Sequence, residues 1–163
     1  MIEYVPMEVK HADGVTFVDE ESFSVPWRKE DFICEAKKGD KAIYFVAIDT
    51  EKDMVVGYAG MWHIINEGHI TNVAVLHDYR RQGIADRFME KLIDIANERE
   101  MIGITLEVRM NNVAAQKLYH KYGFRSEGIR KNYYADTKED AVIMWKYFPI
   151  YEDYDTLEED QKQ

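Results

Sequence analysis

A strand, a turn with two arginines and a glycine, and a long amphipathic helix occupy the centre of the chain in that order. Residues 70–75 are apolar and rich in β-branched side chains, which is typical of a buried strand. Residues 80–85 have the sequence RRQGIA. The segment after them spaces its apolar side chains at helical intervals: Phe88, Leu92, Ile95 and Ala96. A second strand at 104–109 and a second helix at 112–122 follow, so the pattern predicts strands that alternate with helices.

The turn at residues 80–85 is suited to a phosphate group. The first backbone N–H groups of a helix have no partner within the helix, and the helix dipole makes that end attractive to anions. Gly83 lets the backbone approach a ligand without a Cβ in the way, and Arg80 and Arg81 add positive charge. One glycine after two arginines also occurs at ordinary helix starts, so the turn by itself leaves both interpretations open.

Three motifs in order resemble the GNAT superfamily of N-acetyltransferases. RRQGIA at residues 80–85 resembles the Q/R-x-x-G-x-G/A signature, which holds the pyrophosphate of acetyl-CoA in that superfamily. LEVRMNNVAA at 106–115 looks like the next strand and helix start, and LYHKYGF at 118–124 looks like the L-Y-x-x-x-G-F segment after it. The resemblance covers about residues 1–150.

Two further motifs resemble one branch of that superfamily. SVPW at residues 24–27 and RKNYY at 130–134 are similar to the RimI-type enzymes, which acetylate the N-terminal alanine of a small-subunit ribosomal protein. The resemblance implies direct transfer of an acetyl group from acetyl-CoA to a protein α-amine in a ternary complex. The same core also serves enzymes that act on a lysine side chain or a small-molecule amine. A non-catalytic acetyl-CoA-binding module and a scaffold partner of translation or tRNA-modification proteins are the alternatives from other classes.

The order of elements is β-α-α-β-β-β-α-β-α-β-β, and it resembles the α+β GNAT fold. That fold is a mixed, largely antiparallel central sheet of about seven strands, flanked by helices and splayed at the acetyl-CoA site. Besides the segments above, strands are expected at 2–7, 43–49, 54–63, 124–129 and 142–148, and helices at 11–23 and 29–37. Asp13 is a candidate helix cap, and residues 66–68 are a candidate turn.

The resemblance also implies where the coenzyme binds. Backbone groups of one strand pair with the pantetheine arm like an extra strand: Val73, Ala74 and Val75. The loop and helix start hold the pyrophosphate: Arg81, Gln82, Gly83, Ile84, Ala85 and Asp86. Asn112 opens the next helix and matches a residue that contacts the coenzyme. Two positions depart from the pattern, since many relatives have glycine at Ala85, and a basic residue is common where Asp86 adds nothing to phosphate affinity.

Acetyl transfer to an amine requires a neutral amine, a donor to the oxyanion and an acid for the leaving thiolate. From the strand pattern alone, Glu107 faces solvent or pairs with Arg109; the resemblance implies that it is the general base, directly or through water. From the helix pattern alone, Tyr119 is a half-buried tyrosine bonded to backbone; the resemblance implies that it is the general acid. A backbone N–H near residues 73–75 is the expected oxyanion donor.

The acceptor peptide is expected to meet three aromatic residues. Trp27 follows Pro26 in a loop, and either lines a substrate groove or fills the core; the resemblance favours the groove. Tyr133 and Tyr134, with Trp27, form an expected aromatic entrance, although aromatic pairs in late strands are more often core. No metal is expected, because the five histidines show no metal-ligand spacing.

Composition restricts the partners. The net charge of −10 argues against general binding to nucleic acid or to an anionic membrane, and would suit a basic peptide. The single cysteine, Cys34, excludes an internal disulfide and favours a cytoplasmic protein, and its apolar neighbours predict that it is buried. No stretch is apolar enough to span a membrane. Residues 1–150 are expected to form one acetyltransferase domain, as a monomer or weak dimer, and residues 151–163, with six acids and one lysine, a flexible tail.

Overall fold

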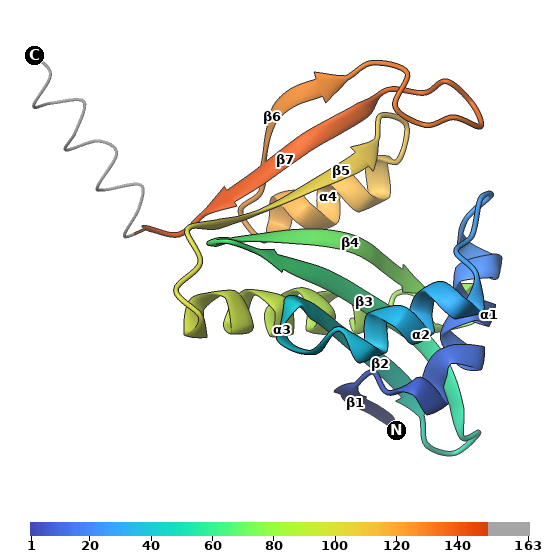
Figure 1. Ribbon diagram of the computed structural model, residues 1–163. Helices are drawn as coiled ribbons and strands as arrows, with labels where there is room; N and C mark the ends of the chain where they lie inside the picture. Colours follow the sequence, from blue (N-terminus) through green and yellow to red (C-terminus); the bar gives the residue numbers. More distant parts are fainter. Residues whose placement is uncertain (150–163) are drawn as a thin grey trace, which may run out of the picture. The chain divides into compact units, whose positions relative to one another are not determined.

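The computed structural model describes residues 1–149, and its elements follow the predicted order. Short 3₁₀ turns separate some of them. The helices and strands are β1 (Ile2–Pro6), α1 (Ala12–Ser22), α2 (Lys29–Lys37), β2 (Ala42–Asp49), β3 (Met54–Ile64), β4 (Glu67–Val75), α3 (Ile84–Glu98), β5 (Gly103–Arg109), α4 (Val113–Lys121), β6 (Arg125–Arg130) and β7 (Ala141–Tyr147) (Figure 1). The expected tail at 151–163 lies outside the described residues.

The strands form a seven-stranded mixed sheet in the order β1-β2-β3-β4-β5-β7-β6. β1 is antiparallel to β2, β2 to β3, and β7 to both β5 and β6. β4 and β5 are parallel, which is consistent with the helix α3 that connects them. Since helices flank this sheet, the expected α+β class with a mixed, largely antiparallel sheet is confirmed.

Two compact units make up the chain. Among the described residues, unit 1 consists of Met1–Ile64 and Ile70–Ile93, and unit 2 consists of Ile65–His69 and residues 94–149. Strand β4 and helix α3 each contribute residues to both units.

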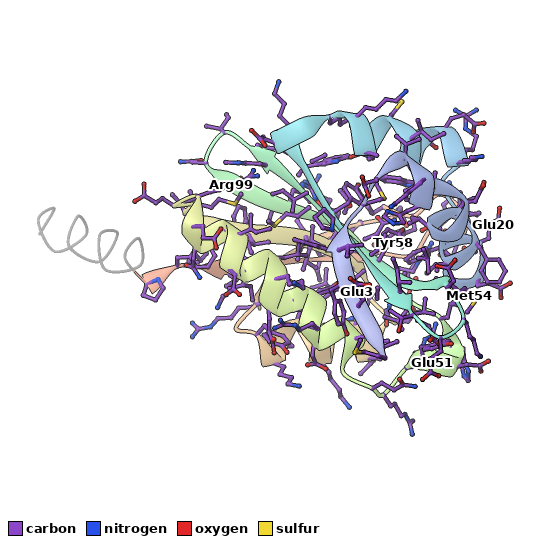
Figure 2. All side chains as sticks on the ribbon, turned by 90° about the horizontal axis from the view of Figure 1, so that it is seen from below. Glu3, Glu20, Glu51, Met54, Tyr58 and Arg99 are labelled. Carbon is purple, nitrogen blue, oxygen red and sulfur yellow. The ribbon has the colours of Figure 1, made fainter. Side chains whose placement is uncertain are left out.

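In unit 1, helices cover both faces of β3. The Cβ position of Gly57 lies 3.3 Å from the Phe88 ring of α3. Tyr58, the next residue, points to the opposite face, where its ring centroid lies 5.4 Å from that of Phe32 in α2. Successive side chains of a strand point to opposite faces, so this alternation places α3 on one face and α1 and α2 on the other. The interior position of Tyr58 can be followed in Figure 2.

In unit 2, β5 has one apolar and one polar face. Its buried residues alternate with half-buried polar ones: Ile104, Leu106 and Val108 on one face, and Thr105, Glu107 and Arg109 on the other. Tyr119 of α4 packs against Phe124, with ring centroids 5.8 Å apart. The polar face of β5 therefore carries side chains that can form hydrogen bonds and ion pairs.

Three local expectations are wrong. β4 begins at Glu67, so the turn before it is shorter than the predicted turn at residues 66–68. The turn contains Ile65, which is 93% exposed and has a positive φ of 55°. The N-cap of α1 is His11, and Asp13 instead pairs with Lys29 at 2.8 Å in the first turn. Cys34 is exposed, because it lies on the outer face of α2 while Phe32 and Glu35 take the buried positions. Among the helices of the described chain, none is long and apolar enough to span a bilayer.

Candidate active site

The loop before α3 has the geometry of an anion cradle. Gly83 has a positive φ of 79°, and the space where its Cβ would lie is open to 4 Å. Arg87 N donates to the Gly83 carbonyl at 3.0 Å, so the N-terminal end of α3 lies at this glycine. Arg80 Nε donates to the Val75 carbonyl at 3.1 Å and so ties the loop to the end of β4. Arg81 and Gln82 are exposed beside this end of the helix.

The other residues of the expected coenzyme site in unit 1 differ in how far they are buried. Ile84 is buried and anchors the first turn of α3, while Ala85 and Asp86 are half-buried. Asp86 places a carboxylate in the first turn of α3, where it opposes an anionic ligand. In β4, Ala74 and Val75 are buried and Val73 is half-buried, and the neighbouring strand of this segment within unit 1 is β3.

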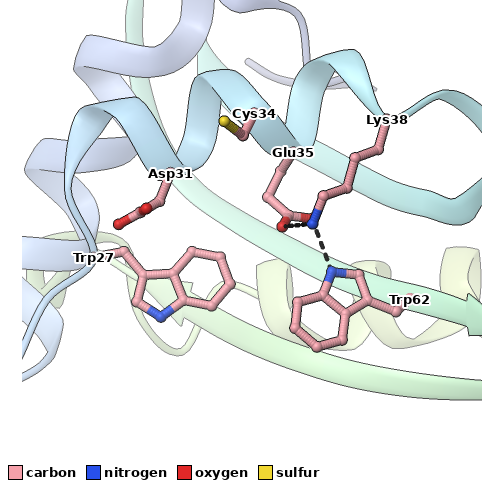
Figure 3. Close-up of a pocket in the computed structure, with 6 residues that line it drawn as sticks. All are labelled: Trp27, Asp31, Cys34, Glu35, Lys38 and Trp62. Carbon is pink, nitrogen blue, oxygen red and sulfur yellow. Dashed lines mark hydrogen bonds and ion pairs between the residues drawn. The ribbon is translucent and has the colours of Figure 1, made fainter.

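Trp27 lines a pocket of about 360 Å³ in unit 1. The other lining residues come from α2, its C-cap and β3: Asp31, Cys34, Glu35, Lys38 and Trp62 (Figure 3). Glu35 accepts hydrogen bonds from Lys38 Nζ at 2.6 Å and from Trp62 Nε1 at 2.8 Å, so its charge is balanced inside the pocket. Trp27 is half-buried and its ring lies 5.4 Å from that of Phe32, so it is both a core contact and a pocket wall.

A buried carboxylate holds the Trp27 loop in place. Asp19 of α1 is fully buried and accepts the backbone N–H of Trp27 at 2.7 Å. The Tyr58 hydroxyl donates to Asp19, and Asn72 Nδ2 donates to the Tyr58 hydroxyl at 2.6 Å. Burial and the negative charge of Asp19 raise the pKa of Tyr58 above its ordinary value. The network therefore connects the loop of Trp27 to β3 and β4 within unit 1.

Replacing Asp19 with asparagine is expected to lower the free energy of unfolding by about 1–3 kcal/mol, because an amide cannot accept from both Tyr58 and the Trp27 N–H as the carboxylate does. Denaturant unfolding followed by tryptophan fluorescence measures the change. Glu20→Gln, at an exposed position of the same helix, is the matched control and is expected to stay within about 0.5 kcal/mol of wild type. Equal stabilities of the two variants would contradict the proposed role of the network.

Glu107 is an ionised carboxylate with a partner at each oxygen. Its side chain is 12% exposed, its Oε2 lies 2.8 Å from His69 Nε2, and its Oε1 lies 3.4 Å from Arg130 Nε. The hydrogen bond from His69 is the main cause that lowers the pKa of Glu107, against the effect of burial, and Arg130 adds to it. The possible pairing of Glu107 with Arg109 is wrong, since Arg109 bonds Asp136 at 2.9 Å and Glu139 at 3.4 Å.

Tyr119 is a buried phenol on α4 of the same unit. It is 7% exposed, and burial raises its pKa above the ordinary value, as does the nearby Tyr134. The side chain is thus buried, and not half-buried as the helix pattern alone predicts. The phenol therefore stays protonated at neutral pH and retains a proton to donate.

Tyr133 and Tyr134 lie in the connection between β6 and β7 and not in the core. Tyr133 is 48% exposed, and its ring meets that of Tyr134 edge-on at 5.1 Å. The Arg109 guanidinium lies 4.0 Å from the centre of the Tyr134 ring, and burial raises the pKa of Tyr134 to about 12. The ion pairs of Arg109 with Asp136 and Glu139 thus fasten this connection to β5.

In unit 2, Asn112 opens α4 as predicted from the sequence, whereas the partner of Glu107 was not found from the sequence. Asn112 is the N-cap of α4, where its Oδ1 accepts the Ala115 N–H at 3.1 Å. His69 is the partner of Glu107, and sequence reasoning missed it because the strand was expected to begin at Ile70. The parallel register places His69 opposite Thr105 and so near Glu107, and no local pattern in the sequence specifies this register. Within residues 1–149, no group of histidine, cysteine or acidic side chains is arranged to hold a metal ion.

Comparison with known proteins connects this geometry to one family. Residues 12–124 match the acetyltransferase (GNAT) family. The chain is 38% identical over 140 residues to the proposed [ribosomal protein bS18]-alanine N-acetyltransferase of Bacillus subtilis, covering 85% of this chain and 91% of that protein. The crystal structure of the ribosomal-protein-S18-alanine N-acetyltransferase from Escherichia coli matches with a TM-score of 0.81 and 30% identity, over 90% of this chain and 94% of that one. PaiA N-acetyltransferase from Thermoplasma acidophilum, in complex with coenzyme A, shares the fold, with a TM-score of 0.76 at 16% identity over 91% of this chain and 99% of that one.

Proposed function

The chain belongs to the acetyltransferase (GNAT) family, and on that premise we propose that it transfers an acetyl group from acetyl-CoA to the α-amine of the N-terminal alanine of ribosomal protein bS18. The chain is similar, over most of the length of each chain, to relatives named as acetyltransferases of bS18. This similarity supports the choice of acceptor. The observation that carries the proposed chemistry is that one unit contains both an ionised carboxylate, Glu107, and a buried protonated phenol, Tyr119.

Coenzyme binding is assigned to the loop and helix start in unit 1 and to two further segments. The amides at Gly83 to Asp86 and the side chains of Arg81 and Gln82 would hold the pyrophosphate, because a helix N-terminus with open space at Gly83 accommodates an anion closely. The backbone of Val73 to Val75 would pair with the pantetheine arm, and one of its N–H groups would stabilise the oxyanion. Asn112 would contact the coenzyme from the start of α4.

The acceptor is assigned to the aromatic residues on two loops. Trp27, held by Asp19, and Tyr133 with Tyr134, held by Arg109, would contact the first residues of the peptide. The acidic chain, with a net charge of −10, favours a basic peptide such as a ribosomal protein segment. An aromatic site suits a peptide backbone, because rigid rings offer a large contact area at little cost in conformational entropy.

The chemical step is a direct transfer within a ternary complex. The α-ammonium of the acceptor loses a proton to Glu107, directly or through water. The neutral amine then attacks the thioester carbonyl. As the C–N bond forms and the C–S bond breaks, the sulfur takes a proton from Tyr119. The attacking nitrogen then gives up its second proton, which passes to Tyr119 and regenerates the phenol at the end of the cycle.

Transfer of labelled acetyl from acetyl-CoA to a panel of acceptors tests the proposal. The panel contains a peptide with the N-terminal sequence of bS18, the same peptide blocked at its α-amine, a lysine peptide and a polyamine. We expect label only in the peptide with a free α-amine. Transfer mainly to lysine or polyamine would replace the proposed acceptor and keep the family's chemistry, and coenzyme binding without transfer to any acceptor would contradict the proposed activity.

A further inference from the structure

The pocket beside Trp27 combines a carboxylate with an indole ring at each of its two ends. At one end, Lys38 Nζ lies 2.6 Å from Glu35 Oε1 and 5.2 Å from the centre of the Trp62 ring. This end therefore already binds a cation of the chain itself. At the other end, Asp31 of α2 lies beside the Trp27 ring, as Figure 3 shows. The second end thus offers the same two kinds of group to a cation from outside.

Asp31 is placed to accept a hydrogen bond from a ligand in the pocket. Its Oδ2 accepts the Arg28 backbone N–H at 2.9 Å and lies 3.8 Å from Arg28 Nε, so this oxygen caps the start of α2. Because both contacts use the same oxygen, Oδ1 is the atom through which the carboxylate would meet a ligand. The side chain is 45% exposed, which makes it accessible from solvent.

The Trp27 wall of the pocket is fixed in advance by contacts behind it. Its backbone N–H donates to the buried Asp19 at 2.7 Å, and its ring lies 5.4 Å from that of Phe32. A wall that is already ordered loses little conformational entropy when a ligand binds. The face of an indole ring attracts a cation more strongly than that of phenylalanine or tyrosine. Trp27 is therefore suited to stack against a cationic group.

Size and charge restrict the ligand to one cationic side chain. The volume of about 360 Å³ lies at the lower end of the range of about 300–1,000 Å³ that is typical of ligand sites. The lining has two carboxylates, Asp31 and Glu35, against one ammonium, Lys38, which disfavours an acidic ligand. A guanidinium is planar, stacks on aromatic faces and forms paired hydrogen bonds with carboxylates, whereas an ammonium is compact and strongly hydrated. These properties favour arginine over lysine.

We propose that this pocket binds an arginine side chain of the acceptor peptide, downstream of its N-terminal alanine; this rests on the proposed function. The guanidinium stacks on the Trp27 ring and donates to Asp31 Oδ1, at the end of the pocket away from Lys38. The contact is made to a residue that does not react, so it acts on the choice of N-terminus. The pocket thus selects acceptors that carry an arginine close to their first residue.

Citrulline in place of arginine separates the charge of the side chain from its shape, because it replaces the guanidinium with an uncharged urea group of nearly the same size. The test peptides begin with alanine and carry one arginine, placed in turn at each position from the second to the sixth. Each has a matched citrulline peptide. At one position at least, we expect wild-type kcat/KM to be about 10-fold higher for arginine than for citrulline.

Asp31→Asn tests the carboxylate end of the pocket. The asparagine oxygen can still accept the Arg28 N–H and cap α2, but the negative charge is lost. The ratio of kcat/KM between arginine and citrulline should fall to about 3-fold, the preference that stacking on Trp27 alone would retain. Glu30→Gln is the matched control, since it removes an acid from an exposed position in the same first turn of α2. It should keep the wild-type ratio.

The outcomes distinguish this inference from the proposed function. Equal kcat/KM for arginine and citrulline at every position would overturn the arginine pocket and leave the acetylation of α-amines intact. A ratio that stays at the wild-type value in Asp31→Asn would also overturn it, because the arginine would then bind elsewhere. Label in no free α-amine would overturn the proposed function and this inference together. Thermal unfolding shows that each variant is folded, and the wild-type comparison with citrulline depends on no variant.

Discussion

Glu107→Gln is expected to lower kcat for acetyl transfer by about 10²–10⁴-fold, the range typical of a lost general base. Glutamine keeps the size of the side chain, but removes the negative charge that faces His69 and Arg130. The proton of the acceptor then has no stabilised destination. Steady-state kinetics with the α-amine peptide and labelled acetyl-CoA measure the loss, and the affinity for coenzyme should change little.

A matched control makes this result decisive. Glu127→Gln changes an exposed glutamate of β6 in the same unit and should leave kcat near wild type. An active Glu107→Gln would remove the carboxylate from the mechanism.

Tyr119→Phe is expected to reduce kcat by about 10²–10³-fold with little change in KM. The ring keeps its packing against Phe124, and only the hydroxyl is lost. Without a proton donor, the leaving group departs as a thiolate and the barrier to C–S cleavage rises. Because burial raises the pKa of Tyr119, the wild-type phenol stays protonated, and its ionisation should produce no fall in rate across the neutral range.

Tyr122→Phe is the matched control, since it removes a hydroxyl from a half-buried tyrosine at the end of the same helix. It should retain the wild-type rate. Equal losses in the two variants would indicate a general effect on α4 and not an acid at Tyr119, and a wild-type rate in Tyr119→Phe would assign the proton donor elsewhere.

Much of the fold could be predicted from local patterns. The bounds expected for α2 agree with the structure, and the order of strands and helices is confirmed, because apolar periodicity depends on neighbouring residues. The errors occur where a position depends on distant contacts. Asp13 has the chemistry of a cap but lies inside the first turn, and Cys34 has apolar neighbours but lies on the outer face of α2.

The sequence by itself determined the family and the identity of the candidate acid and base, since the motifs around Glu107 and Tyr119 are contiguous stretches of chain. Only the tertiary structure decided the partners of these residues. The ion pair of Glu107 depends on the register of β4 against β5, and the support of Trp27 depends on Asp19, which lies eight positions earlier in the chain. The reason is physical: hydrogen bonds between residues 38 positions apart, as in His69 and Glu107, follow from strand pairing and burial, which no local pattern specifies.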